Sequence, residues 1–389
     1  MEDFSYLTQR SKGTRRPQRS SSRWIPVLSL RTLPPLRLCV VIERSSRREV
    51  GCRSACALLL GCLLGLIGGC TTRQPDIVVY AALDREFSEP LLNDFGRATG
   101  FRVLAKYDDE STKTVGLTNI LIQEASRPRC DVFWNNEILN TLRLEEKALL
   151  EAYACPVAEM YPEMYRSPQG LWHGFAARAR VLIVNTNLVK EGERPRSIYD
   201  LADEKWKGKV GIARPIAGTM ATHAAVLFAV LGEEKAKEFF RSLRANDVQI
   251  LGGNKQAAQA CAAGQIAFGL TDTDDAIIEV ERASPVTIVY PDREADQLGT
   301  LFIPNTLAIL KGCPHPESAK MLADFLLSPA VEEKLAHCPS AQIPLNRKVK
   351  VKLRIESPKT VKAMPADFAA AASKWDAAAK FIEEEFSAR

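Results

Sequence analysis

Two stretches in the second half of the chain hold the side chains best suited to bind a charged ligand. The first, TDTDD, follows the apolar residues FGL, and the second is RPIAGTMATH. Carboxylates bind hard cations or amines, although Asp residues also commonly cap a helix. An arginine fork suits phosphate or carboxylate, with a surface ion pair as the alternative. A Gly-Thr pair before an apolar helix is an ordinary helix start, whose N–H groups also hold anions. The candidates are Thr273, Asp274, Asp275, Arg214, Gly218, Thr219 and Thr222.

A second set of candidates lies in the first half of the chain, again in segments that follow apolar runs. Trp134 is a stacking surface for a ligand or a core residue, and both interpretations stay open. Oxygen donors from both halves could form a metal site, for which we single out Tyr80, Glu137, Asp274 and Asp275. The first-half candidates are Tyr80, Ser111, Thr112, Trp134, Asn135, Asn136 and Glu137.

Strands and helices alternate along the mature region, which predicts a parallel α/β sheet. The run IVVY is a β-branched strand, a helical spacing of apolar residues follows it, and Gly100 ends that helix. A buried strand, ARVLIVN, lies in mid-chain and separates two such α/β sets near residue 180. We also expect a helix at 138–150, a strand at 299–306 and one amphipathic helix at 366–386. Ligands of open α/β sheets bind beyond the carboxyl ends of the strands, where the candidate residues occur.

The N-terminal region is typical of an export signal. Arginines precede an apolar run at 55–67, which is too short to span a bilayer and ends in Gly68, Gly69 and Cys70. This ending resembles the lipobox of bacterial lipoproteins, in which the cysteine is acylated after cleavage. We therefore interpret 47–69 as a lipoprotein signal, 70–76 as a tether and 1–46 as a disordered extension or an over-called translation start. A signal cleaved without lipidation and a retained membrane anchor are the alternatives.

Composition, charge and cysteine count exclude some classes of function. Of 389 residues, 46% are hydrophobic and 25% charged, which suffices for one large or two medium cores. The net charge of +5 owes much to the arginines before residue 54, so the remainder lacks the basic face that nucleic acid requires. Five of the ten cysteines follow Cys70, an odd number that cannot all pair, and no zinc-type spacing occurs.

An ordered series of segments carries a resemblance to a known family. It consists of the opening strand, DVFWNNE, YDLADEKWKGKVGIARP, FGLTDTDDA, FIPNTLAILKGCPHPESAKMLADFLLSP and SAQIPLN. Together they resemble the bacterial extracellular solute-binding proteins that include the ferric-iron-binding components of ABC importers. This resemblance covers about 75–346. It implies a type 2 periplasmic binding protein fold, in which two α/β lobes close on a ligand about crossing strands. It also implies a monomer that needs no cofactor and delivers a small molecule or metal ion to a membrane permease. The expected lobes are 77–178 with 297–345, and 179–296 with 346–389.

The sequence departs from this family at the residues most relevant to iron. Ferric-binding members typically show adjacent tyrosines after the strand that here reads FGL, whereas this chain has Asp274 and Asp275. The identity of the ligand therefore stays open between iron bound by carboxylates and an anionic or zwitterionic compound such as a phosphate or phosphonate. Polyamines and thiamine are further alternatives. A periplasmic enzyme on the same fold, with Glu137 and Asp274 as acid and base, is the alternative function. We predict no enzyme activity because no nucleophile or metal-protease motif occurs.

Overall fold

The computed structural model describes residues 77–108 and 113–386, all of which belong to one compact unit, Thr72–Arg389. The predicted extension at 1–46, signal at 47–69, tether at 70–76, lipidation site Cys70, and the candidates Ser111 and Thr112 lie outside the described residues. None of the described helices is long and apolar enough to cross a bilayer.

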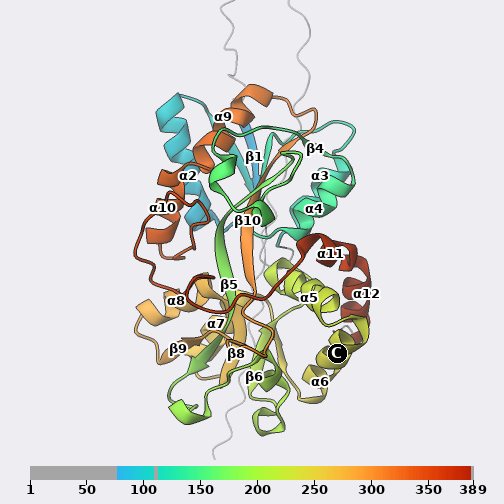
Figure 1. Cartoon of the computed structure of the whole chain (residues 1–389), viewed down its shortest axis with the longest axis vertical. Helices are drawn as coiled ribbons and strands as arrows, with labels where there is room; N and C mark the ends of the chain where they lie inside the picture. Colours follow the sequence, from blue (N-terminus) through green and yellow to red (C-terminus); the bar gives the residue numbers. More distant parts are fainter. Residues whose placement is uncertain (1–76, 109–112, 387–389) are drawn as a thin grey trace, which may run out of the picture. The chain divides into compact units, whose positions relative to one another are not determined.

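The first lobe is a sheet covered by helices on both faces (Figure 1). Strands β1 (Ile77–Ala81), β2 (Val103–Tyr107) and β3 (Val132–Asn135) are parallel, in the order β2-β1-β3. The antiparallel strand β10 (Phe302–Leu310) continues this sheet beside β3, and the short β4 (Leu150–Glu151) pairs with its end. The helices of this lobe are α2 (Arg85–Thr99), α3 (Val115–Gln123), α4 (Leu139–Glu146), α9 (Pro316–Leu326) and α10 (Pro329–His337).

The second lobe repeats this arrangement with a smaller sheet. Strands β8 (Phe268–Asp272), β6 (Val210–Ala213) and β7 (Gln249–Leu251) are parallel neighbours in that order. The strand β9 (Val286–Val289) lies at the edge, antiparallel to β5. The helices are α5 (Gly218–Val230), α6 (Glu233–Ala245), α7 (Asn254–Ala262) and α8 (Thr273–Glu281).

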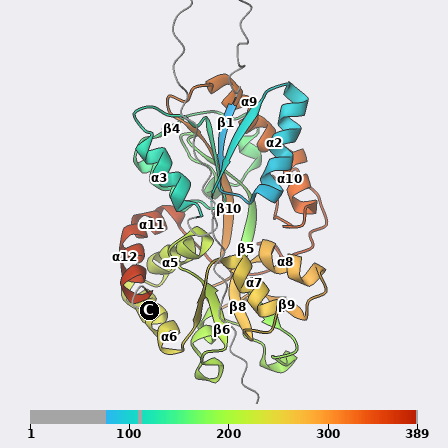
Figure 2. The same ribbon diagram turned by 180° about the vertical axis from the view of Figure 1, so that it is seen from behind.

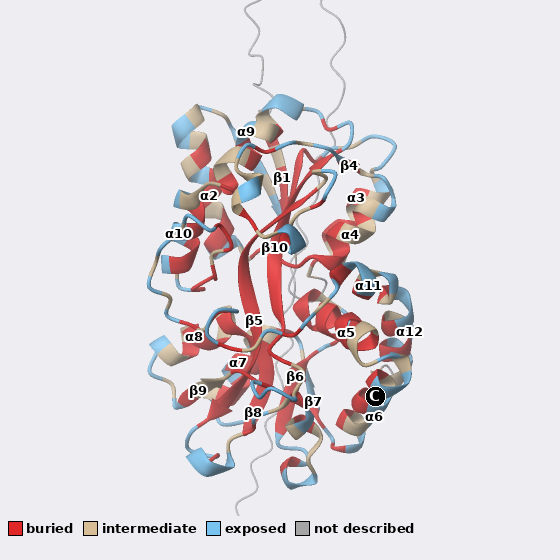
Figure 3. Cartoon of the chain, in the orientation of Figure 1, coloured by how far each residue is buried: buried red, intermediate tan, exposed pale blue. Residues whose placement is uncertain are grey.

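The long strand β5 (His173–Asn185) belongs to both lobes. Its first half pairs with β10, from Leu307 opposite His173 to Phe302 opposite Ala179, and its second half pairs with β8 and β9. Every residue of β5 and β10 is buried, so both strands appear red throughout in Figure 3. The prediction of two α/β lobes joined by crossing strands is therefore confirmed.

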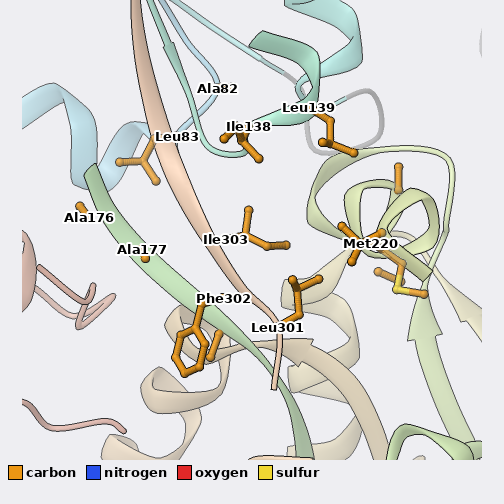
Figure 4. Close-up of a cluster of buried hydrophobic side chains, with 14 of the residues drawn as sticks. Ala82, Leu83, Ile138, Leu139, Ala176, Ala177, Met220, Leu301, Phe302 and Ile303 are labelled. Atoms are coloured by element: carbon orange, nitrogen blue, oxygen red, sulfur yellow. The ribbon is translucent and has the colours of Figure 1, made fainter. Parts of the chain in front are cut away.

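An apolar layer surrounds the crossing strands where the lobes meet. Figure 4 shows Ala176 and Ala177 of β5 and Leu301–Ile303 close to Leu83, Ile138 and Leu139, which come from the starts of first-lobe helices. Met220 of α5, in the second lobe, lies among the same cluster. These contacts exclude water around the polar groups described below.

Three predicted element bounds are wrong. The predicted single C-terminal helix is two helices, α11 (Phe368–Ser373) and α12 (Trp375–Phe386), separated at Lys374. Asp367 caps the start of α11 by accepting hydrogen bonds from the amides of Ala369 and Ala370. The helix expected at 138–150 ends at Glu146, since Leu150 is used by β4, and the strand expected at 299–306 is Phe302–Leu310. Helix α11 contacts α4 of the first lobe as well as α5 of the second, and Figures 1 and 2 both show it between them. The predicted lobe bounds remain a prediction.

Candidate ligand-binding site

Two arginines of β5 form the centre of a buried polar group. Arg178 and Arg180 are two residues apart on a strand, so their side chains leave the same face of the sheet. Arg180 is fully buried, and its Nη1 donates to Asp272 Oδ1 (2.6 Å), Asn254 Oδ1 (2.9 Å) and Thr219 Oγ1 (3.2 Å). Its partners thus tie together three segments of the second lobe.

Arg178 instead connects the two lobes. Its Nη1 donates to the carbonyl oxygen of Asn136, and its Nη2 donates to Asn305 Oδ1 on β10 (3.2 Å). Its Nε lies 3.0 Å from Asp274 Oδ2 of the second lobe, an ion pair without hydrogen-bond geometry. The guanidinium is only 1% exposed, so water does not replace these partners.

Three carboxylates gather where β8 ends and α8 begins, and we call Asp272, Asp274 and Asp275 the acidic triad. One oxygen from each lies within 4.8 Å of the others. Asp272 is neutralised by Arg180 and also accepts hydrogen bonds from Thr219 Oγ1 (2.5 Å) and Asn254 Nδ2 (3.0 Å). By contrast, Asp274 Oδ1 is buried without a hydrogen-bond partner in the described part of the chain, and Asp275 has no ion pair there.

The environment of the triad favours protonated or cation-bound carboxyl groups. Burial raises the pKa of Asp274 to about 6, because the opposing charge of Arg178 only partly compensates and Asp272 adds repulsion. Burial and the charge of Asp274 raise the pKa of Asp275 well above its ordinary value. A bound cation would remove both penalties.

The first lobe contributes a second charged pair to the same region. Lys113 Nζ lies 2.5 Å from Asp84 Oδ1, immediately before α2. Burial alone would raise the pKa of Asp84, but Lys113 and Arg178 lower it below its ordinary value. The charges of Asp84 and Lys113 also act on the pKa values of Asp274 and Asp275: Asp84 raises them and Lys113 lowers them. This pair therefore lies within electrostatic reach of the acidic triad.

Glu137 joins the lobes rather than adding to the triad. Its carboxylate accepts hydrogen bonds from the amides of Leu139 (2.5 Å) and Asn140 (2.9 Å), and so caps α4. It also accepts from Asn135 Nδ2 (2.8 Å) and, across the lobe boundary, from Thr222 Oγ1 (2.8 Å). With four donors bound to it, Glu137 has little capacity left for a metal ion. A second bond across the boundary joins the amide of Gly218 to the carbonyl oxygen of Lys113 (3.0 Å).

The structure does not bring three of the candidates into this group. Tyr80 donates its hydroxyl to Glu124 (2.9 Å), just past the last residue of α3. Trp134 is fully buried and packs on Phe175 with ring centroids 5.5 Å apart. Arg214 is exposed and lines a separate hollow of about 610 Å³ together with residues of α12.

The remaining candidates occupy supporting positions. Thr273 Oγ1 accepts a hydrogen bond from the amide of Ala179 (3.1 Å), which joins α8 to β5. Asn136 is buried and offers its carbonyl oxygen to Arg178, while its Oδ1 has no partner among the described residues. Gly218 begins α5 with φ +57, a left-handed conformation that glycine adopts without strain.

Comparison with known proteins identifies the family. The family model for bacterial extracellular solute-binding proteins matches residues 139–372, more than half of the chain. The chain belongs to this family. The predicted resemblance is thereby confirmed, and the function of this solute-binding protein is to capture a small solute for an ABC-type importer.

Individual relatives of this solute-binding protein carry different ligands. Iron uptake protein A1 of a Synechocystis strain is 27% identical over 291 residues, which are 71% of this chain and 79% of the relative. The crystal structure of iron-bound HitA from Pseudomonas aeruginosa superposes with a TM-score of 0.72 and 21% identity, covering 79% of this chain and 98% of that one. AfuA from Actinobacillus pleuropneumoniae, with fructose-6-phosphate bound, gives 0.71 and 22%, covering 80% and 99%. At these identities the two structures establish the fold of this solute-binding protein.

Several residues of the site were missed in the sequence, although one signal was present. Arg178 and Arg180 interrupt the apolar strand FAARARVLIVN, and fully buried arginines are rare unless they are paired. The alternation placed them on one face of a buried strand and could have identified them. Asp84, Lys113 and Asn254 carry no such signal, because single polar residues at helix starts occur in most proteins.

Proposed function

We propose that this solute-binding protein captures a hard, multiply charged metal cation, of which ferric iron is the example among its relatives. The observation that carries the proposal is the acidic triad, with its buried, unpartnered Asp274 oxygen. Carboxylate oxygens are the ligands that hard cations prefer. The names of iron uptake protein A1 and iron-bound HitA support the same ligand class.

The charges around the triad favour a cation over an anion. Arg180 pairs with Asp272, Arg178 with Asp274 and Lys113 with Asp84, which leaves Asp275 without an ion-pair partner among the described residues. Each Nη atom of Arg178 and Arg180 already donates to a protein atom, which for Arg180 Nη2 is the sulfur of Met220, whereas the two Nε atoms have no hydrogen-bond partner among the described residues. Arg214, whose guanidinium favoured a phosphate ligand in the sequence, lies outside the group. A phosphate group would therefore add negative charge to a site that has a surplus of it.

Capture follows from a difference in affinity between two states. The triad belongs to the second lobe, whereas Asp84 and Lys113 belong to the first, so a cation experiences all these charges together when the lobes are closed. A ligand with higher affinity for the closed state shifts the population toward it. The hydrogen bond between Thr222 and Glu137 also stabilises the closed state. A permease in the membrane then binds the closed form.

The test is calorimetric titration of the purified mature protein with terbium(III), a soluble hard cation, and with ferric nitrilotriacetate, at pH 7 and pH 5. We expect one site, proton release on binding, and an affinity about tenfold or more lower at pH 5. Protons compete with the cation for Asp274, whose pKa is raised to about 6, and for Asp275, whose pKa is raised well above its ordinary value. Fructose-6-phosphate and 2-aminoethylphosphonate serve as the anionic and zwitterionic comparisons. Binding of either compound without response to the cations would refute the cation proposal but leave the solute-binding function intact.

We also propose that the mature protein is anchored through a lipid on Cys70 and acts outside the cytoplasmic membrane as a monomer. The basic and apolar residues before Cys70 and the membership of an extracellular family support this location. Cells grown with an alkyne-tagged fatty acid should incorporate the tag into the wild-type protein and not into Cys70→Ser. Equal labelling of both proteins would contradict the anchor.

A further inference from the structure

The segment that follows Asn346 has an unusual composition that solute capture does not explain. Residues 347–362 read RKVKVKLRIESPKTVK, with seven basic residues and one acidic residue, Glu356. In its first half, basic side chains alternate with Val349, Val351 and Leu353. In an extended chain such alternation separates the two kinds of side chain onto opposite faces.

This basic segment, as we call residues 347–362, runs beside the crossing strands as a further connection. At its start the amide of Arg347 donates to the carbonyl oxygen of Met160 in the first lobe (2.9 Å). Just past its end the amide of Met364 donates to the carbonyl oxygen of Thr300 (2.8 Å), two residues before β10. The chain passes so close to Gly299 that a Cβ there would lie 2.6 Å from the backbone of Ala363. Both ends are therefore fixed.

Between these ends the basic segment covers a hollow of about 360 Å³, within the size range of small-molecule sites. Val349, Val351 and Leu353 line one side of this hollow. The other walls come from the first lobe, the start of β10 and the chain beyond the basic segment, and they include Met164, Tyr165, Phe302, Leu345, Met364 and Phe368. The interior is thus mainly apolar, and Met164 is 55% exposed at its edge.

Cationic side chains border this apolar hollow. Arg347 and Lys359 line it, are exposed, and form no ion pair with any residue that the structure describes. Two other basic residues are already engaged: Arg354 pairs with Glu281, and Lys362 Nζ donates to carbonyl oxygens at 294, 295 and 297. Lys348, Lys350 and Lys352 are exposed and do not line the hollow.

We propose that this hollow binds an anionic single-chain amphiphile, with the chain against Val349, Val351 and Leu353 and the acid group on Arg347 and Lys359. Each methylene that leaves water adds favourable free energy of binding, so an alkyl chain supplies most of the affinity. The two cations select an acid over an alcohol, because a charge-assisted bond is about twice as strong as a neutral one. This site is separate from the acidic triad and does not depend on which solute the triad binds.

The experiment is calorimetric titration of the mature protein with dodecanoate, dodecanol and dodecyltrimethylammonium below their aggregation limits. We expect saturable one-to-one binding of dodecanoate, at least about tenfold weaker binding of the other two, and a loss of at least about tenfold for dodecanoate in Arg347→Glu/Lys359→Glu. The matched control is Lys350→Glu/Lys352→Glu, which makes the same charge change outside the hollow and should lose less than about threefold. Thermal melting checks that all variants fold.

Val351→Trp separates the hollow from simple surface adsorption, because the indole fills the space from its apolar side. We expect it to abolish dodecanoate binding while terbium binding at the acidic triad is unchanged. Equal binding of dodecanoate and dodecanol would overturn the proposal, and so would equal losses of affinity in the two charge-reversed variants. It would also be overturned if the wild type did not bind dodecanoate but adsorbed to anionic phosphatidylglycerol vesicles, and Val351→Trp adsorbed to them equally.

Discussion

Replacing Asp274 and Asp275 together by asparagine is expected to weaken terbium or ferric binding by at least about 100-fold, since each lost charged contact costs about 1.5–3 kcal/mol. Asparagine keeps the size and one oxygen of each side chain, so the loss reports charge rather than shape. Calorimetry at pH 7 measures the change in affinity directly.

The same variant should fold at least as stably as the unliganded wild type at pH 7. In the wild type the raised pKa of Asp274 means that the folded state binds more protons than the unfolded state between about pH 4 and pH 6. Stability from this group is therefore lost as pH rises through that window. Asparagine removes this penalty, so its melting temperature should change less between pH 5 and pH 7.

Asp376→Asn is the matched control, since it removes an exposed carboxylate from α12 by the same chemical change. It should alter neither cation affinity nor the pH dependence of melting. If Asp274→Asn/Asp275→Asn bound terbium as tightly as the wild type, the acidic triad would not be the cation site.

The sequence predicted one side of the site and missed the other for physical reasons. Asp274 and Asp275 follow a strand that is easily recognised, and the carboxyl ends of strands face the ligand in this architecture. Tyr80 satisfies the same rule, yet its hydroxyl meets Glu124. Four of the five residues of β1 are buried, so apolar alternation could not indicate toward which neighbours the Tyr80 side chain points.

Contacts between residues far apart in the sequence were not predictable from local patterns. Glu137 and Thr222 are 85 positions apart, and Arg180 and Asp272 are 92 apart. Each residue has an ordinary local role, as a helix cap, a helix residue or a strand residue. The packing of the two lobes brings Glu137 and Thr222 together, whereas the antiparallel pairing of β5 with β8 places Arg180 opposite Asp272 within the second lobe. The two-lobed architecture was predictable because strand and helix periodicities repeat along the chain.

The conversion of Arg180 to methionine should destabilise the protein by about 3–5 kcal/mol, the usual result of removing one partner from a buried ion pair. Methionine preserves much of the apolar stem but leaves Asp272 buried with Thr219 and Asn254 as its hydrogen-bond donors. Urea denaturation at pH 7 without added metal measures the loss.

Two further measurements separate lost charge pairing from lost packing. Arg180→Met/Asp272→Asn should recover part of the stability, because the amide carries no charge that needs a partner. Terbium should stabilise Arg180→Met more than it stabilises the wild type, since removal of the guanidinium leaves the acidic triad with one more uncompensated negative charge. If the double variant were as unstable as Arg180→Met and terbium gave no added protection, Arg180 would act through packing alone. The balance of charge at the lobe boundary would then not depend on it.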